Sequence, residues 1–212
     1  MSQPMWWYTV RASGLVAWAI LAASVAWGLW LSARPARRPR PAWILDLHRF
    51  LGALGLVFVV IHLVGLSFDR FVGFGPTDLL VPFASHWRPG AVAWGVIAMD
   101  LVLAVELTSV AMRLLPRRLW HGVHLVSIAA YGLATAHVFT AGTDASSPLV
   151  LAFGIVATGV VAAMLLARLV IGLRRRVRVE PRVPVLPPPT SIMWVASATE
   201  GRPLRSGVLP RS

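Results

Sequence analysis

The sequence contains no cysteine, which excludes disulfide bonds, thiol catalysis, iron–sulfur clusters and cysteine-held zinc. It also contains no lysine, and charged residues make up only 13% of its 212 positions, against about 25% in a typical soluble domain. Hydrophobic residues make up 57%. This shortage of charge argues against an ordinary water-soluble fold.

The charged residues are mostly basic: 20 arginines and 8 acidic residues give a net charge of +12. A basic excess can indicate nucleic-acid binding, but these arginines cluster directly beside long apolar runs. That placement is typical of a membrane protein anchored on its cytoplasmic side. We therefore expect a lipid bilayer as partner and no nucleic acid.

Five apolar stretches are bounded by charges, and each can cross a hydrocarbon core of ~30 Å as a helix. They are residues 12–33, 43–68, 91–112, 119–143 and 145–167. Lipid offers no partners to backbone amides, so helices are the expected structure. The sequence predicts an all-α, polytopic membrane helix bundle of about five transmembrane helices, with the first one retained rather than cleaved as a signal peptide.

The arginine-rich loops predict the orientation of the bundle. Arginines separate the first two spans, separate the third from the fourth, and follow the fifth. The positive-inside rule then places the N-terminus outside and the C-terminus inside a plasma (inner) membrane. We divide the chain into an outer N-terminal segment (1–10), a transmembrane domain (11–176) and a Pro-rich cytoplasmic tail (177–212) that is expected to be disordered.

Four of the six histidines lie inside predicted spans: His48 and His62 in the second, His124 and His137 in the fourth. An ionisable side chain inside a membrane indicates function, and imidazole is an axial ligand of haem iron. Spacings of 14 and 13 residues correspond to rises of ~20 Å. Because the two spans are parallel, His48 shares the cytoplasmic level with His124, and His62 shares the outer level with His137. Each pair could hold one haem b.

The helical phase supports this interpretation for the second span better than for the fourth. Fourteen residues leave two side chains within ~40° of one face, whereas thirteen leave them ~140° apart. An irregularity near Gly132, or a laterally offset haem, would have to absorb the difference. Gly52 and Gly55 between the first two histidines, like Gly132, either admit a macrocycle or serve helix packing.

Other roles for the histidines stay open. They could form interhelical hydrogen bonds or a proton path. One zinc ion is disfavoured, because ligands ~21 Å apart along a helix cannot converge on it. His121 could replace His124 as the inner ligand or lie at the interface, as we expect for His86.

The chain resembles the ferric reductase-like transmembrane domain family, notably its stand-alone actinobacterial members, over roughly residues 6–175. The resemblance rests on WYTVRASG, LDLHRFLGALGLVFVVIHL, LLVPFASHWRP and RRLWHGVHLVSIAAYGLATAHVFTAGTD. The family includes the membrane domains of ferric reductases and NADPH oxidases and the haem subunit of the periplasmic methionine sulfoxide reductase system. It implies that His48, His62, His124 and His137 are the axial ligands of two b-type haems, with the spacings of 14 and 13 belonging to the family pattern.

The sequence departs from that pattern in two ways. Many relatives have six spans where five are counted here, and many carry a fused flavin–nicotinamide domain that this sequence lacks. Flavin is therefore expected only through a partner, and oxidation of a nicotinamide by this polypeptide alone is not expected.

Four further charged residues have two readings each. Arg49 and Arg11 could bind haem propionates through bidentate hydrogen bonds or extend to lipid headgroups. Asp100 and Glu106, in the third span, could relay protons or balance the charge of a reduced haem, but we favour ordinary buried hydrogen bonds for both.

Together these observations predict an electron-transfer membrane component, a b-type cytochrome with one or two bis-His haems. Electrons would pass from a flavin-containing or quinone donor towards an extracytoplasmic acceptor. The alternatives are a quinone-reacting anchor of a larger complex, or a non-redox transporter subunit or assembly factor whose histidines are structural or relay protons.

Overall fold

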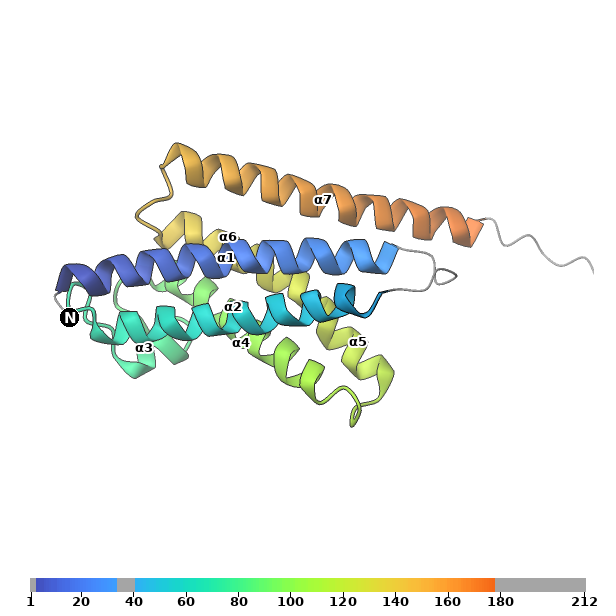
Figure 1. Ribbon diagram of the computed structural model, residues 1–212. Coiled ribbons are helices and arrows are strands. Elements are labelled where there is room, and N and C mark those ends of the chain that lie inside the picture. The colour runs from blue at the N-terminus through green and yellow to red at the C-terminus, as the bar shows by residue number, and fades with distance from the viewer. Residues whose placement is uncertain (1–2, 34–40, 178–212) are drawn as a thin grey trace, which may run out of the picture. The chain divides into compact units, whose positions relative to one another are not determined.

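The computed structural model describes residues 3–33 and 41–177, and these residues form helices and connecting loops without a strand. The helices are α1 (Gln3–Ala33), α2 (Ala42–Phe68), α3 (Pro76–Leu80), α4 (Pro89–Val110), α5 (Arg117–Leu125), α6 (Ser127–Ala141) and α7 (Pro148–Val177) (Figure 1). Residues up to Ile171 form one compact unit, to which the description below applies. The structure describes nothing beyond Val177, so the predicted tail (177–212) lies outside the described residues except for its first position.

Five segments of this described chain are long and apolar enough to cross a membrane: α1, α2, α4, α5 with α6, and α7. The prediction of an all-α, five-helix, multi-pass membrane bundle is therefore confirmed. The first helix begins at Gln3, so most of the segment predicted to precede the transmembrane domain continues the first span as helix. Many large apolar side chains of this unit, between Met5 and Ile171, are exposed, as expected where lipid rather than water surrounds the protein.

The closest packing within the unit joins α1 to α2 and α4 to α6, and α1 also contacts α6. A small core forms where α1, α6 and α7 meet. It is centred on Trp18, Ala22, Val25, Leu29, Tyr131 and Val161. Trp18 is 3% exposed, its Nε1 donates to Thr135 at 3.0 Å, and its ring meets Phe153 edge-on. This core positions α1 against the helix that carries His137.

The fourth span is interrupted at Val126, two residues after His124. The Val126 amide bonds to the Val123 carbonyl oxygen at 3.0 Å, which is the tighter i→i−3 pattern of a 3₁₀ turn. A tighter turn adds rotation per residue and so reduces the phase difference between His124 and His137. The expected irregularity therefore lies at Val126 rather than near Gly132.

Candidate functional site

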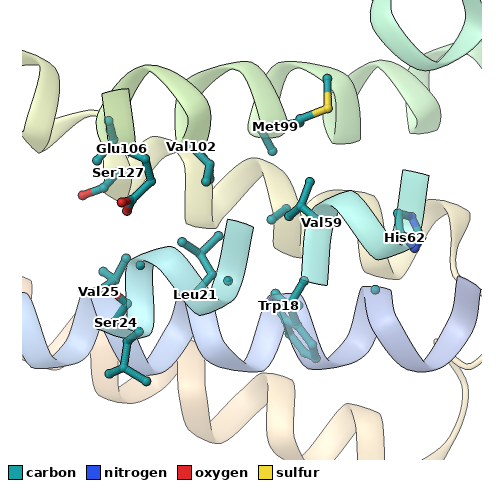
Figure 2. A pocket seen from close by; sticks show the side chains of 18 of the residues that line it. Trp18, Leu21, Ser24, Val25, Val59, His62, Met99, Val102, Glu106 and Ser127 are labelled. Atoms are coloured by element: carbon teal, nitrogen blue, oxygen red, sulfur yellow. The ribbon is translucent and has the colours of Figure 1, made fainter. Parts of the chain in front are cut away.

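A cavity of about 1340 Å³ lies inside the bundle and is lined by α1, α2, α4, α5 and α6. This exceeds the ~300–1,000 Å³ of most small-molecule pockets. Its middle is apolar: Val59 of α2 and Met99 and Val102 of α4 lie across from Leu21 of α1 (Figure 2). All four membrane histidines line it. The cavity therefore combines room for large apolar groups with imidazoles from two helical segments.

The structure brings His48 and His124 together, as the equal-depth argument predicts. Their ring centroids are 5.8 Å apart and their planes make an angle of 78°. Metal–imidazole bonds are about 2.0–2.1 Å long, so two axial rings on one metal ion have centroids roughly 6 Å apart. The separation of these rings is therefore compatible with a shared metal ion between them.

His62 and His137 are the pair predicted at the outer level, and both line the cavity. The Nδ1 atom of His62 lies 2.8 Å from the carbonyl oxygen of Val10, and that of His137 lies 2.7 Å from the carbonyl oxygen of Ala91. A carbonyl oxygen only accepts, so each Nδ1 carries the proton and donates it. In the neutral imidazole, Nε2 is then unprotonated and has a lone pair available for a metal.

The other pair has weaker supports of the same kind. The Nδ1 atom of His48 lies 3.5 Å from the Ser24 hydroxyl, and that of His124 lies 3.5 Å from the Ser109 hydroxyl. Both distances are at the long limit for hydrogen bonds. Thus α1 supports both histidines of α2, and α4 supports both histidines of the fourth span. Partners that hold Nδ1 are a regular feature of metal-ligating histidine.

Three glycines that sequence reasoning missed provide space for these rings. A Cβ on Gly14 would lie 2.9 Å from Nδ1 of His62, one on Gly95 2.7 Å from Nδ1 of His137, and one on Gly28 3.1 Å from Cε1 of His48. Each glycine lies four residues after the residue that bonds Nδ1: Val10 and Gly14, Ala91 and Gly95, Ser24 and Gly28. The spacing of four residues is visible in the sequence. It identifies a histidine-supporting site only once the structure shows which histidine packs against each glycine.

The glycines singled out from the sequence behave differently from one another. Gly52 and Gly55 line the cavity, and a Cβ on Gly52 would collide with the carboxylate of Glu106. Gly132 is exposed and has no side chain near its Cβ position among the described residues. Gly132 is absent from the cavity lining, so its position does not favour the reading in which it admits a macrocycle.

Both arginines considered as cofactor contacts line the cavity, but each has a carboxylate partner. Arg11 forms a two-point ion pair with Asp144, in which its Nε donates to Oδ2 at 2.7 Å and its Nη2 donates to Oδ1. Its guanidinium also lies 4.0 Å from the centre of the Trp7 ring. Arg49 lies 3.4 Å from Asp46 in an exposed pair. Their binding to propionates stays a prediction.

The two acids of α4 lie on different faces of that helix. Glu106 lines the cavity and points into it beside Ser127 (Figure 2). Asp100 is exposed and lies away from the cavity lining. Neither carboxylate has a hydrogen-bond or ion-pair partner among the residues that the structure describes, so the favoured reading of both as ordinary buried hydrogen-bonded groups is wrong.

The remaining candidate ligand, His121, also lines the cavity. The Trp120 ring stacks on His124, with centroids 5.2 Å apart, and lies 6.0 Å from His121. His124 is the one that meets His48, which favours His124 over His121 as the partner in that pair. His86 lies in the loop before α4, where it helps to line a separate small cavity of about 320 Å³.

Within the described chain, no three His, Asp or Glu side chains converge as a metal site of their own. The donor set is two imidazole pairs, which suits a planar macrocycle that supplies its own equatorial ligands.

No protein-family model, curated protein or solved structure matches this chain.

Proposed function

We propose that this protein is a transmembrane electron carrier that holds one b-type haem at each histidine pair. The observation that carries the proposal is the pair of Nδ1 hydrogen bonds at Val10 and Ala91, which leave Nε2 of His62 and His137 available inside a large apolar cavity. The 5.8 Å separation of His48 and His124 supports the same arrangement at the second level.

The protein's own residues would do three things in this function. The four imidazoles would hold the two haem groups, and the carbonyl and hydroxyl partners would orient the rings. The apolar cavity wall, including Met99 and Val102, would exclude water. Haem, when bound, supplies reversible one-electron chemistry, and the protein sets its orientation and potential.

The proposed orientation assigns each histidine pair to one side of the membrane. With the N-terminus outside the plasma membrane, the His48/His124 pair lies near the cytoplasm and the His62/His137 pair near the outer surface. A flavin-containing or quinone partner would deliver electrons, and an extracytoplasmic acceptor would receive them.

Visible spectroscopy on the purified full-length protein tests the haem proposal. A reduced-minus-oxidised spectrum should show a b-type signal, and His62→Ala should remove one component of it. His86→Ala is the matched control, because it alters a histidine outside the two pairs and should leave the signal intact. A colourless protein after expression with sufficient haem would instead support a non-redox transporter subunit or assembly factor. Equal b-type signals in all three chains would show that His62 is not a haem ligand.

A further inference from the structure

Asp100 lies at the midpoint of a membrane-crossing helix, eleven residues after Pro89 and ten before Val110. At ~1.5 Å per residue it is ~15 Å from either end of α4, which is the deepest part of the hydrocarbon. The residue is exposed, and the cavity is lined by other faces of α4. A carboxyl group directed at lipid tails is costly, and such groups normally pair with something.

No partner for Asp100 is found within the described part of this chain. Four arginines are engaged elsewhere: Arg11 with Asp144, Arg49 with Asp46, Arg88 with Thr140 and Arg168 with Ser32. We therefore look for the partner outside the described residues. It must present a polar group at the membrane midplane.

The neighbours of Asp100 on the same face form a seam suited to another helix. Ile97, Asp100, Ala104 and Leu107 follow one another at spacings of three, four and three residues, which is the a/d pattern of packed helices. Asp100, Ala104 and Leu107 are exposed, and all four residues lie away from the cavity lining. The small side chain of Ala104 permits close approach of a second backbone.

We propose that this α4 face is the interface of a homodimer, with the two Asp100 side chains hydrogen-bonded to each other at the membrane midplane. A two-fold axis along the membrane normal brings residues of equal depth together, so Asp100 meets Asp100. A carboxyl group that carries its proton has one donor and one acceptor, which makes it self-complementary across that axis. The interface is independent of the proposed haem function.

Disulfide trapping tests this interface directly, because the natural chain has no cysteine. The full-length protein carrying Ala104→Cys is reconstituted into phosphatidylcholine vesicles and oxidised. Copies packed along α4 bring the Cα atoms towards the ~4.4–6.8 Å range of a disulfide. Val160→Cys, on α7 and 47% exposed, is the matched control. We expect covalent dimers from Ala104→Cys and only background from Val160→Cys.

Changes at Asp100 in the Ala104→Cys background complete the test. Asp100→Asn keeps a donor and an acceptor and should retain the cross-link. Asp100→Leu removes both and should weaken dimerisation roughly tenfold, with helix content checked by circular dichroism. Equal cross-linking at positions 104 and 160, or an unchanged yield with Asp100→Leu, would overturn the proposal. Cross-linking only in native membranes, to a protein of different mass, would overturn it in favour of a heterologous helix that carries a cation.

Discussion

Gly14 lies so close to the ring of His62 that a Cβ on this glycine would stand 2.9 Å from Nδ1. The two residues belong to different helices and are 48 positions apart in the chain. Four residues before Gly14, the Val10 carbonyl accepts the hydrogen bond from the same Nδ1. One turn of α1 therefore provides both the space and the partner for this imidazole.

Substitution of these glycines should displace the histidine rings. Gly14→Ala and Gly95→Ala place a methyl group under 3.0 Å from a ring atom, and overpacking of this kind costs about 1–3 kcal/mol. We expect each variant to lose most of one spectroscopic haem component, measured in reduced-minus-oxidised spectra. Gly28→Ala should have a milder effect, since its Cβ would lie 3.1 Å from His48.

Gly159→Ala provides the control for this series. Gly159 lies on a membrane helix like the others, but its Cβ position is open among the described residues. Gly159→Ala should therefore leave the reduced-minus-oxidised haem spectrum unchanged. Loss of signal in Gly159→Ala equal to that in Gly14→Ala would show that the effect is general helix perturbation rather than contact with a histidine.

The ion pair between Arg11 and Asp144 should contribute to stability, because it joins α1 to the loop between α6 and α7. Its side chains are only 29% and 23% exposed, and hydrogen bonds to charged groups contribute about 1.5–3 kcal/mol. Asp144→Asn should lower the thermal unfolding midpoint of the purified protein, followed by circular dichroism. Asp46→Asn breaks a pair that is 59% and 63% exposed and should change the midpoint little. Equal effects of the two variants would contradict this account.

Much of this arrangement is readable from the sequence, and the reasons are local. Charges such as Arg34 and Asp69 bound the apolar runs, so the five spans follow from length and hydropathy. Spacings of 14 and 13 place the histidines at two depths, because helical rise is constant. The meeting of His48 with His124 follows once the two spans are known to be parallel.

Other features depend on contacts that no local pattern specifies. The bond from His137 to Ala91 joins residues 46 positions apart, and that between Arg11 and Asp144 joins residues 133 apart. Helix periodicity indicates that a face is apolar but does not say which helix covers it. The roles of α1 and α4 as supports for the histidines, and the exposed position of Asp100, therefore required the three-dimensional structure.

Paired substitutions should reveal which histidines share a cofactor. His48→Ala with His124→Ala should lose little more haem than either single change, since loss of one axial ligand already disrupts a bis-imidazole site. His48→Ala with His137→Ala should lose both components, because these residues belong to different pairs. Haem extraction quantified against protein gives the measurement, with two haems per natural chain as the reference. A double variant at 48 and 137 that keeps one intact haem would show that the pairing is crossed.

Electron transfer across a sealed bilayer tests the central claim most directly. Haem-loaded protein is reconstituted into vesicles that contain ferricyanide, and dithionite is added outside as a reductant. We predict bleaching of the trapped ferricyanide with the natural chain, and a rate near that of protein-free vesicles with His62→Ala or His48→Ala. Fully haem-loaded natural protein that bleaches ferricyanide no faster than protein-free vesicles would contradict a transmembrane electron route through the two histidine pairs.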